Sequence, residues 1–343
     1  MKKCLTLVLT LAMLLFLLCG CGGAPASNAG GSSGDSGGGV ATPTAAVGDA
    51  NDVYYMISYL STLEFWDDCY AGFQSAASIW GAQTEYTGAP GVDAAAQITV
   101  LEQVMATNPA GIAITVCDAT ALDDTIDKAI EQGIEVVCFD AASEGSRRYS
   151  VLQTGNESAG GALADVAAAE LGEQGECAIM FSVGSPTHEA RATGIRNGIA
   201  KYASMSSFDV NYDGEQNDAA SQAASAIQAN PNLKAIFVTN ANGALGAAAA
   251  VREAGKSGEI LVIGFDTDGG MYEAIESGDI FATARQGCYN MGFWSFQFLF
   301  MTKNNLVNPI DGWREAGMSP LPPHVDTGVD IVTKSNLSTF YGG

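Results

Sequence analysis

Glu135-Val136-Val137-Cys138-Phe139-Asp140 is a short apolar run that ends in a carboxylate. The run Ile260-Leu261-Val262-Ile263-Gly264-Phe265-Asp266, in the second half of the chain, has the same form. Short continuous runs of β-branched and aromatic residues are typical of strands buried on both faces, as in parallel sheets. The two runs therefore predict two buried strands, each with an aspartate at its carboxyl end.

On either side of these two runs, strand-like and helix-like segments alternate along the chain. In the first half we expect strands at residues 53–59, 84–87, 111–116 and 135–140, separated by helices at 65–81, 94–107 and 121–132. In the second half we expect helices at 158–171, 189–202, 219–230 and 245–253, and strands at 177–181, 208–212, 235–239 and 260–266. Because helical crossovers join parallel strands, the sequence predicts an α/β fold of two successive lobes.

The first 50 residues are expected to carry an export signal and a linker. Two lysines precede an apolar run, residues 4–18, that is too short for a transmembrane helix. Leu18-Cys19-Gly20-Cys21 resembles the lipobox of bacterial lipoproteins, which predicts a signal peptide at residues 1–20 and lipidation of Cys21. Residues 21–50, rich in Gly, Ser and Ala, predict a flexible linker. We expect an extracytoplasmic protein, lipid-anchored to the bacterial cell membrane; an ordinary secretory signal is the alternative.

The composition is acidic, with 15 Lys and Arg against 38 Asp and Glu and a formal net charge of −23. Such a charge argues against nucleic acid or an anionic membrane surface as the bound partner. The two histidines, His188 and His324, have no Cys, Asp or Glu at metal-ligand spacing. Gly243-Ala244-Leu245-Gly246 does not match the dinucleotide-binding pattern. We therefore expect no metal site and no cofactor.

Five cysteines follow the signal and linker region: Cys69, Cys117, Cys138, Cys177 and Cys288. None forms a Cys-x-x-Cys pair, and most lie in apolar segments, where a thiol packs as a small hydrophobic group. A disulfide between Cys117 and Cys138 is left open by the sequence.

Polar and aromatic residues gather where the predicted strands end. In open parallel sheets, ligands bind beyond the carboxyl ends of the strands. The residues near these ends are Phe65, Trp66, Asp140, Arg191, Asn240, Asp266 and Gln286. Carboxylates accept hydrogen bonds from sugar hydroxyls, arginine donates to sugar oxygens, and aromatic faces cover the C–H side of a sugar ring. The set favours the binding of a polyol.

These residues lie in segments that strongly resemble the ribose-binding protein group of periplasmic-type solute-binding proteins. The segments are Ile57 to Trp66, Val137-Cys138-Phe139-Asp140, Glu189-Ala190-Arg191 with Gly194, Asn240 with Ala244-Leu245-Gly246, and Val262-Ile263-Gly264-Phe265-Asp266. The likeness extends from Val53 onward and keeps the order and spacing of the strand-end residues. It implies a periplasmic binding protein type 1 fold, in which two Rossmann-like lobes, joined by three hinge crossings, enclose a monosaccharide.

The resemblance also implies boundaries for the lobes and a set of partners. The N-terminal lobe would comprise residues 51–154 and 287–324, and the C-terminal lobe residues 155–286 and 325–343. The hinge crossings are expected near residues 153–156, 285–288 and 325. A protein of this group is a monomer that delivers its sugar to the membrane permease of an ABC transporter.

For the site, the resemblance implies that Asp140, Arg191, Asn240, Asp266 and Gln286 bind the sugar hydroxyls, and that Phe65, Trp66 and Phe265 stack on the ring. Each residue has a simpler structural alternative. An aspartate after a strand commonly stabilises a loop, Asn240 can belong to a turn, and a large apolar residue usually packs in the core. We expect Asp266→Ala to abolish binding and to leave the melting temperature of the free protein nearly unchanged.

The chain departs from the pentose-binding pattern in ways that leave the sugar open. Ala141 stands where pentose binders usually have arginine, and Leu63 stands where they have asparagine. Asp213 and Gly214 stand where that pattern has an aromatic residue. The loss of hydrogen-bond donors argues against ribose. Residues 84–90 and 325–329 look like relatives that bind rhamnose or a furanosyl quorum signal.

Other functions fit the sequence less well. A glycosidase would need two catalytic carboxylates flanking the scissile bond. No nucleophile elbow, metal-ligand set or histidine base accompanies the carboxylates, so we expect no enzyme activity and no catalytic residue. A DNA-binding repressor of the same fold would need a helix-turn-helix where this chain has a signal and a linker. A receptor that presents its bound sugar to a sensor kinase remains an alternative to import.

Overall fold

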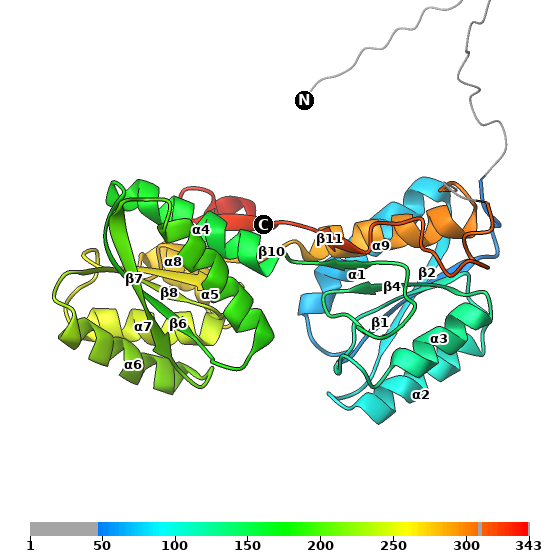
Figure 1. The fold of residues 1–343 in the computed structure, drawn as a ribbon, viewed down its shortest axis with the longest axis horizontal. Helices are drawn as coiled ribbons and strands as arrows, with labels where there is room; N and C mark the ends of the chain where they lie inside the picture. Colours follow the sequence, from blue (N-terminus) through cyan, green and yellow to red (C-terminus); the bar gives the residue numbers. More distant parts are fainter. Residues whose placement is uncertain (1–46, 308–310, 342–343) are drawn as a thin grey trace, which may run out of the picture. The chain divides into compact units, whose positions relative to one another are not determined.

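Residues 47–307 and 311–341 are described by the computed structural model, and they form two α/β lobes (Figure 1). Each lobe contains a six-stranded, mostly parallel sheet with helices on both faces. This arrangement confirms the predicted two-lobe fold class. Within these ranges no helix combines the length and the apolar character needed to cross a membrane. The predicted signal peptide, Cys21 and nearly all of the linker lie outside the described residues.

The sheet of the N-terminal lobe, sheet A, has the strand order β11-β5-β4-β3-β1-β2, and all of its strand pairs are parallel. Its strands are β1 (Val53–Ser58), β2 (Gln83–Gly88), β3 (Gly111–Ile114), β4 (Glu135–Phe139), β5 (Val151–Gln153) and β11 (His324–Asp326). One face is covered by α1 (Phe65–Trp80) and α9 (Cys288–Lys303), and the other by α2 (Ala94–Met105) and α3 (Asp123–Glu131) (Figure 1).

Alternating side chains show why β4 is a central strand. Val137 and Phe139 pack in the core formed with α1 and α9, whereas Val136 and Cys138 pack in the core formed with α2 and α3. All four side chains are fully buried, which explains why this run lacks a polar alternation. Asp140 is the first residue after this buried strand, so its carboxylate lies at the carboxyl end of β4.

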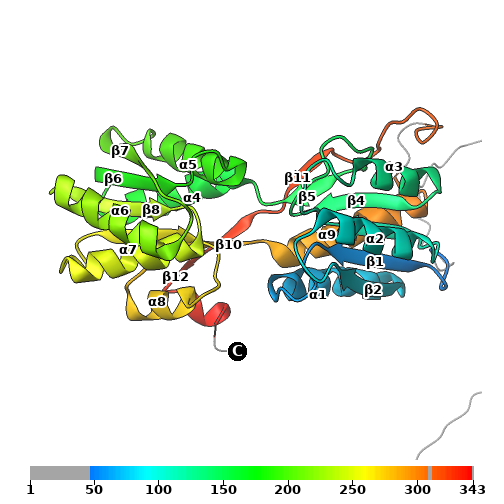
Figure 2. The same cartoon turned by 90° about the horizontal axis from the view of Figure 1, so that it is seen from below.

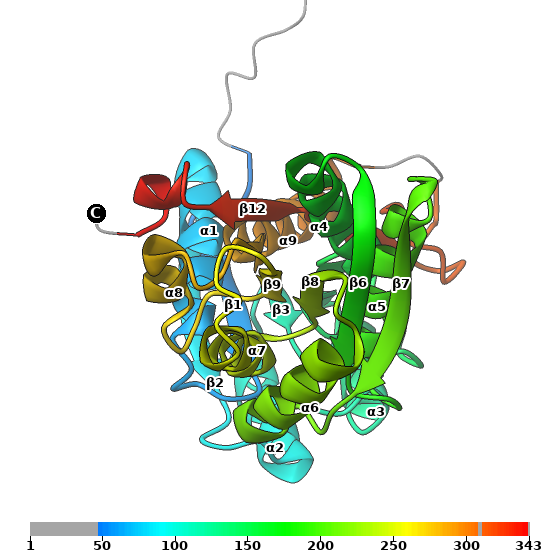
Figure 3. The same cartoon turned by 90° about the vertical axis from the view of Figure 1, so that its left-hand side faces the viewer.

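The sheet of the C-terminal lobe, sheet B, has the order β12-β10-β9-β8-β6-β7 (Figure 3). Its strands are β6 (Gln174–Phe181), β7 (Ser204–Asn211), β8 (Leu233–Val238), β9 (Leu261–Phe265), β10 (Ala282–Gln286) and β12 (Val329–Thr333), of which β12 is antiparallel to β10. Helices α4 (Asn156–Leu171) and α5 (Pro186–Ile199) pack on one face. Helices α6 (Gln216–Ala229), α7 (Ala241–Glu253) and α8 (Met271–Ser277) pack on the other.

Helices α4 and α5 approach closely because glycines lie between them. A Cβ atom on Gly160 would lie 2.3 Å from the carbonyl oxygen of Arg191, and one on Gly194 would lie 2.0 Å from that of Glu157. Only glycine allows the two backbones to come so near at these positions. The contact holds the turn of α5 that carries Arg191 against the first turns of α4.

Three segments connect the lobes, as the fold class predicts. The chain passes from β5 into α4, from β10 into α9, and from β11 into β12 (Figure 2). The backbone amide of Thr327 donates to Gln153 O at 3.0 Å. The Asp326 carboxylate accepts hydrogen bonds from Gly155 N at 2.9 Å and from Ser158 Oγ at 2.6 Å. These bonds tie the first crossing to the third.

The structure also contains elements that the sequence pattern did not predict. Helix α9 was missed because apolar side chains surround it on all sides, so it lacks a 3.6-residue pattern. Strands β5, β11 and β12 contain only 3, 3 and 5 residues. Helix α7 begins at Ala241, before the expected residue 245, because the Asn240 side chain caps its first turn.

Candidate functional site

Asp140 and Asp266 directly follow central strands of the two sheets. Both have a positive φ angle, 58° for Asp140 and 67° for Asp266, a conformation that aspartate tolerates better than most side chains. The amide of Asp140 donates to Leu152 O at 3.0 Å, and the amide of Asp266 donates to Ala284 O at 2.9 Å. Each lobe thus presents a carboxylate in the same way, at the carboxyl end of a parallel strand.

Arg191 is the centre of a polar cluster in the C-terminal lobe, and its side chain is only 5% exposed. Its Nη1 atom donates to Asp266 Oδ2 at 3.2 Å and to Thr239 O at 2.9 Å. Its Nε atom donates to Asn156 Oδ1 at 2.9 Å. The guanidinium carbon lies 4.4 Å from the ring centroid of Phe265, a cation–π contact. These partners hold the guanidinium in one orientation.

Gln286 connects this cluster to the hinge. It is the last residue of β10, where the second crossing begins. Its Nε2 atom donates to Asp266 Oδ1 at 2.7 Å, and its Oε1 atom accepts from Thr154 Oγ1 at 2.9 Å. Thr154 lies in the first crossing, so a chain of hydrogen bonds runs from one crossing through Gln286 to the site carboxylate.

Asn240 is the N-cap of α7 and already has several partners in the protein. Its Oδ1 atom accepts from Gly243 N at 2.7 Å and from the Tyr212 hydroxyl at 2.8 Å. Its Nδ2 atom donates to Gly214 O at 3.0 Å. The structure therefore gives Asn240 the turn role that the sequence left open, beside the predicted ligand-binding role.

The three predicted stacking residues have different surroundings. Trp66 is 1% exposed and packs edge-on against Phe139, with 5.7 Å between the ring centroids. Phe265 is fully buried beneath Arg191. These two rings lie in the cores instead of on an open surface: Trp66 belongs to the core of the N-terminal lobe, and Phe265 to the core between sheet B and helices α4 and α5. Phe65 is half-buried at the start of α1, so it is the ring of the three that is accessible.

Asp140 has a less favourable environment than Asp266. Its Oδ2 atom accepts one long hydrogen bond from Thr115 Oγ1, at 3.4 Å. Burial and the charge of Asp266 together raise the pKa of Asp140 to about 6, although Arg191 opposes both effects. Burial also raises the pKa of Tyr59, and the charge of Asp140 adds to that shift, which locates this phenol beside the carboxylate. The Asp140 carboxylate therefore has capacity to accept further hydrogen bonds.

Several residues of the site were missed by the sequence analysis: Tyr59, Thr115, Thr154, Asn156, His188 and Thr239. Thr115 and Thr239 directly follow β3 and β8, so the strand-end rule could have found them. Asn156 and His188 lie in the first turns of their helices and reach the cluster only through tertiary packing. No local sequence pattern marks such residues.

All five described cysteines are free thiols, so Cys117 and Cys138 do not form a disulfide in this structure. Cys117 is partly exposed, whereas the other four are buried. Among residues 47–307 and 311–341, no group of three or more His, Cys, Asp or Glu side chains is arranged to hold a metal ion.

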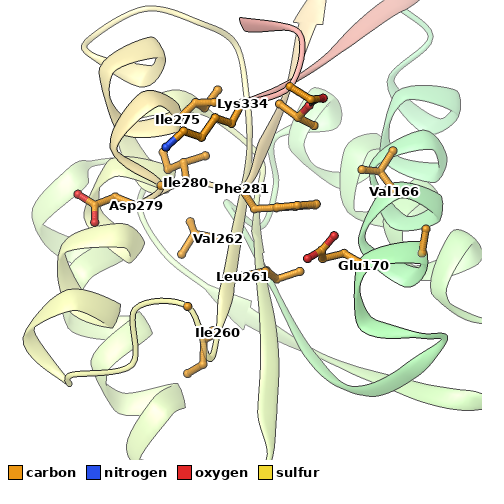
Figure 4. A pocket seen from close by; sticks show the side chains of 15 residues that line it. Val166, Glu170, Ile260, Leu261, Val262, Ile275, Asp279, Ile280, Phe281 and Lys334 are labelled. Atoms are coloured by element: carbon orange, nitrogen blue, oxygen red, sulfur yellow. Dashed lines mark hydrogen bonds between the residues drawn. The ribbon is translucent and has the colours of Figure 1, made fainter.

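A pocket of about 620 Å³ lies at the amino-terminal end of β9, away from the polar cluster (Figure 4). Its lining is largely apolar and includes Leu261, Ile275 and Phe281, with Glu170 and Lys334 as charged members. None of Arg191, Asp266 or Gln286 lines it. The polar cluster at the carboxyl ends of the strands is therefore the better candidate for recognition of a polyol.

Comparison with known proteins gives a consistent result. The chain matches the periplasmic binding protein domain over residues 53–304. It is 28% identical to the D-allose-binding periplasmic protein of Escherichia coli over 259 residues, which are 72% of this chain and 83% of that protein. It is 29% identical to the D-ribose/D-allose-binding protein of Pseudomonas aeruginosa over 205 residues, 57% of this chain and 63% of that protein.

Two solved structures are also similar. The sugar-binding protein of a sugar ABC transporter from Bacillus halodurans superimposes with a TM-score of 0.79 at 38% identity, covering 85% of this chain and 100% of that one. AraP, an arabinose-binding protein from Geobacillus stearothermophilus, gives a TM-score of 0.79 at 39% identity, covering 85% of this chain and 99% of that one. The domain match spans most of the chain, and it agrees with the two-lobe fold. The chain belongs to the periplasmic binding protein domain family.

Proposed function

We propose that this protein captures a neutral monosaccharide outside the cytoplasm for an ABC importer, by closure of its two lobes around the sugar. The observation that carries the proposal is the cluster of Arg191, Asp266 and Gln286, whose hydrogen bonds hold a cation, a carboxylate and an amide at one end of sheet B. The allose-, ribose- and arabinose-binding relatives support an aldopentose or an aldohexose as the ligand.

The residues divide the work of recognition by their chemistry. Asp140 and Asp266 accept hydrogen bonds from sugar hydroxyls, and Arg191 donates to a sugar oxygen. Gln286 and Asn240 contribute amide groups from the end of β10 and the start of α7. Phe65 covers the C–H face of the sugar ring. Trp66 and Phe265 do not contact the sugar but hold residues that do. The ring centroid of Trp66 lies 4.8 Å from that of Phe65, and the Phe265 ring packs against the guanidinium of Arg191.

Closure is selected because only the closed form gives every sugar hydroxyl a partner from both lobes. The moving bodies are the N-terminal lobe, residues 51–154 and 287–326, and the C-terminal lobe, residues 155–286 and 327–343. The last boundary lies two residues later than the sequence indicated, because β11 pairs with β5 in sheet A. A wrong epimer leaves a buried polar group unpaired, at a cost of about 1–3 kcal/mol.

The first test is a thermal-shift screen of the purified protein against aldopentoses, aldohexoses, deoxysugars, inositols and nucleosides, with arabinose, ribose and allose included. A sugar present at a hundred times its dissociation constant stabilises the native state by about 2.7 kcal/mol, which raises the melting temperature by a few degrees. A melting temperature that no sugar raises would rule out the monosaccharide proposal.

The anchor is proposed on the lipobox-like sequence that ends in Cys21. Residues 1–20 act as the signal peptide and residues 21–50 as a flexible tether, so a monomeric receptor stays close to the permease that it supplies. In a bacterial host, Cys21→Ser should release the protein from the membrane fraction and abolish labelling by a radioactive fatty acid. Membrane retention and labelling of the serine variant would contradict the anchor and leave sugar binding unaffected.

A further inference from the structure

His188 lies beside the Arg191 cluster but has no part in the function proposed above. It is one turn before Arg191 on α5, and its side chain is half-buried. Its Nδ1 atom is 3.1 Å from Thr239 Oγ1. The carbonyl oxygen of the same Thr239 accepts a hydrogen bond from Arg191 at 2.9 Å. His188 and Arg191 are therefore held by one residue at the carboxyl end of β8.

The second ring nitrogen of His188 is open. Within the described part of the chain, Nε2 has no protein hydrogen-bond partner, and it does not belong to the buried polar atoms that lack one. It is therefore accessible from outside the protein. Both Arg191 and Asp266 lie close enough for their charges to act on this imidazole. The open nitrogen therefore lies near the cluster of Arg191, Asp266 and Gln286, to which the proposed function assigns the recognition of sugar hydroxyls.

The contact with Thr239 allows two arrangements of the ring hydrogen. The Thr239 hydroxyl either donates to Nδ1 or accepts from Nδ1–H, according to which ring nitrogen carries the hydrogen. With the hydrogen on Nδ1, Thr239 Oγ1 accepts and Nε2 keeps a free lone pair. This second form is the one that accepts a hydrogen bond from a ligand at Nε2.

We propose that His188 is a ligand-contacting residue that selects among monosaccharides, because its Nε2 atom accepts a hydrogen bond from one sugar hydroxyl next to the group bound by Asp266. This inference rests on the proposed sugar-binding function. Burial and the charge of Arg191 lower the pKa of His188, and Asp266 opposes them, which supports a neutral imidazole with an available lone pair near pH 7. A neutral acceptor beside a carboxylate recognises a hydroxyl donor of defined orientation, so it distinguishes epimers.

The first experiment measures affinity by calorimetry for the sugar that responds in the thermal screen and for its epimers. His188→Phe keeps a planar ring of similar size and removes the acceptor. We expect this variant to bind the preferred sugar roughly 10- to 100-fold more weakly. The ratio of its affinities for the preferred sugar and for the epimer that lacks the matching hydroxyl should become smaller. His188→Gln, which retains an acceptor, should recover part of the loss. His324→Gln, which alters the other histidine of the chain, is the matched control and should bind as the unaltered protein does.

The second experiment observes the imidazole directly and does not depend on a variant that folds. Nitrogen-15 NMR of the unaltered protein should show His188 as the Nδ1–H tautomer, assigned by the loss of the other signal in His324→Gln. Saturating sugar should shift the Nε2 resonance, as expected when an imidazole lone pair accepts a hydrogen bond.

The outcomes separate the two proposals. Sugar binding by the unaltered protein, with an unmoved Nε2 resonance and unchanged epimer preference in His188→Phe, would overturn the role of His188 and leave the proposed function standing. An Nε2–H tautomer would overturn the acceptor role in the same way. Failure of the unaltered protein to bind any sugar would overturn both.

Discussion

Asp140 and Asp266 share one backbone geometry and have opposite surroundings. Each follows a central strand with a positive φ, and each donates its amide to the neighbouring strand. The carboxylate of Asp266 receives hydrogen bonds from Arg191 and Gln286, at 3.2 and 2.7 Å. The carboxylate of Asp140 receives one from Thr115, at 3.4 Å. The charged form of Asp266 is therefore stabilised by its partners, whereas burial disfavours the charged form of Asp140.

Asp266→Ala should destabilise the free protein as well as abolish sugar binding. Its removal leaves the buried guanidinium of Arg191 without a charged partner, which we expect to lower the free energy of unfolding by about 2–4 kcal/mol. This result would replace the expectation from sequence that the melting temperature stays nearly unchanged. Urea denaturation of the free variant measures it, and Asp266→Asn, which keeps the side-chain volume, is the control. A change below about 0.5 kcal/mol would show that Arg191 needs no counter-charge.

Asp140→Asn should have the opposite effect on stability at pH 7. The pKa of Asp140 is raised to about 6 in the folded protein, against about 3.9 in an unfolded chain. Between these values the native state binds more protons, so the contribution of Asp140 becomes less favourable as pH rises through this window. The asparagine variant should be more stable than the unaltered protein by roughly 1–3 kcal/mol at pH 7.5, and this advantage should shrink at pH 4.5. An advantage that is independent of pH would show that Asp140 does not titrate in this range.

Sugar affinity should also depend on Asp140 below pH 6. If the ionised carboxylate accepts a sugar hydroxyl, binding favours the deprotonated form, and affinity falls as pH drops below the free-protein pKa of about 6. Calorimetric titrations between pH 5 and 8 test this. The Asp140→Asn variant should bind more weakly and with a flatter pH dependence. Affinity that increases on acidification would mean that the protonated carboxyl is the binding form.

The rate at which Cys117 is alkylated should report whether sugar occupies the N-terminal half of the site. Cys117 is the partly exposed thiol among five free cysteines, and its charge contributes to the raised pKa of Tyr59, which also responds to Asp140. Iodoacetamide should modify Cys117 before the buried thiols, and saturating sugar should slow that reaction several-fold. Peptide mass spectrometry locates the alkylated residue. Equal rates with and without a sugar that binds would place Cys117 outside the closed site.

Substitution of Phe65 should mainly affect sugar affinity, whereas substitution of Trp66 should mainly affect stability. Phe65→Ala removes a half-buried ring at the start of α1 and should weaken sugar binding with a small loss of stability. Trp66→Ala removes a fully buried ring and should lower the free energy of unfolding by about 3–5 kcal/mol. Calorimetry and denaturation of both variants check the contrast. Unchanged affinity in Phe65→Ala would remove it from the proposed site.

The sequence was sufficient to predict the two lobes and their central strands. Runs such as 135–140 and 260–266 carry a strong signal, because both faces of these strands are buried. The edge strands β5 and β11 are only 3 residues long and are specified by pairing with distant segments, which no local pattern encodes. Helix α9 is apolar on all sides, so its periodicity was not visible.

For the site, the strand-end rule located the two aspartates, but it could not tell what surrounds them. Arg191 and Asp266 are 75 residues apart, and their contact depends on how α5 packs against sheet B. Phe265 was expected from sequence to stack on the sugar ring or to pack in the core, and the structure shows that Arg191 covers it. Side-chain partners of this kind follow from tertiary packing, which explains why Thr154 and His188 were also missed.

The locked orientation of Arg191 has a consequence for the order of events in solution. The guanidinium is already held by Asp266, Thr239 and Asn156, so it loses little conformational entropy when a sugar binds. The C-terminal lobe therefore has a preorganised binding surface. Encounter with that surface would set the association rate, and reopening of the lobes would set the residence time. Substitutions around Arg191 should then lower the association rate constant. Substitutions at the crossings should instead change the dissociation rate constant, and with it the time for which the sugar stays bound.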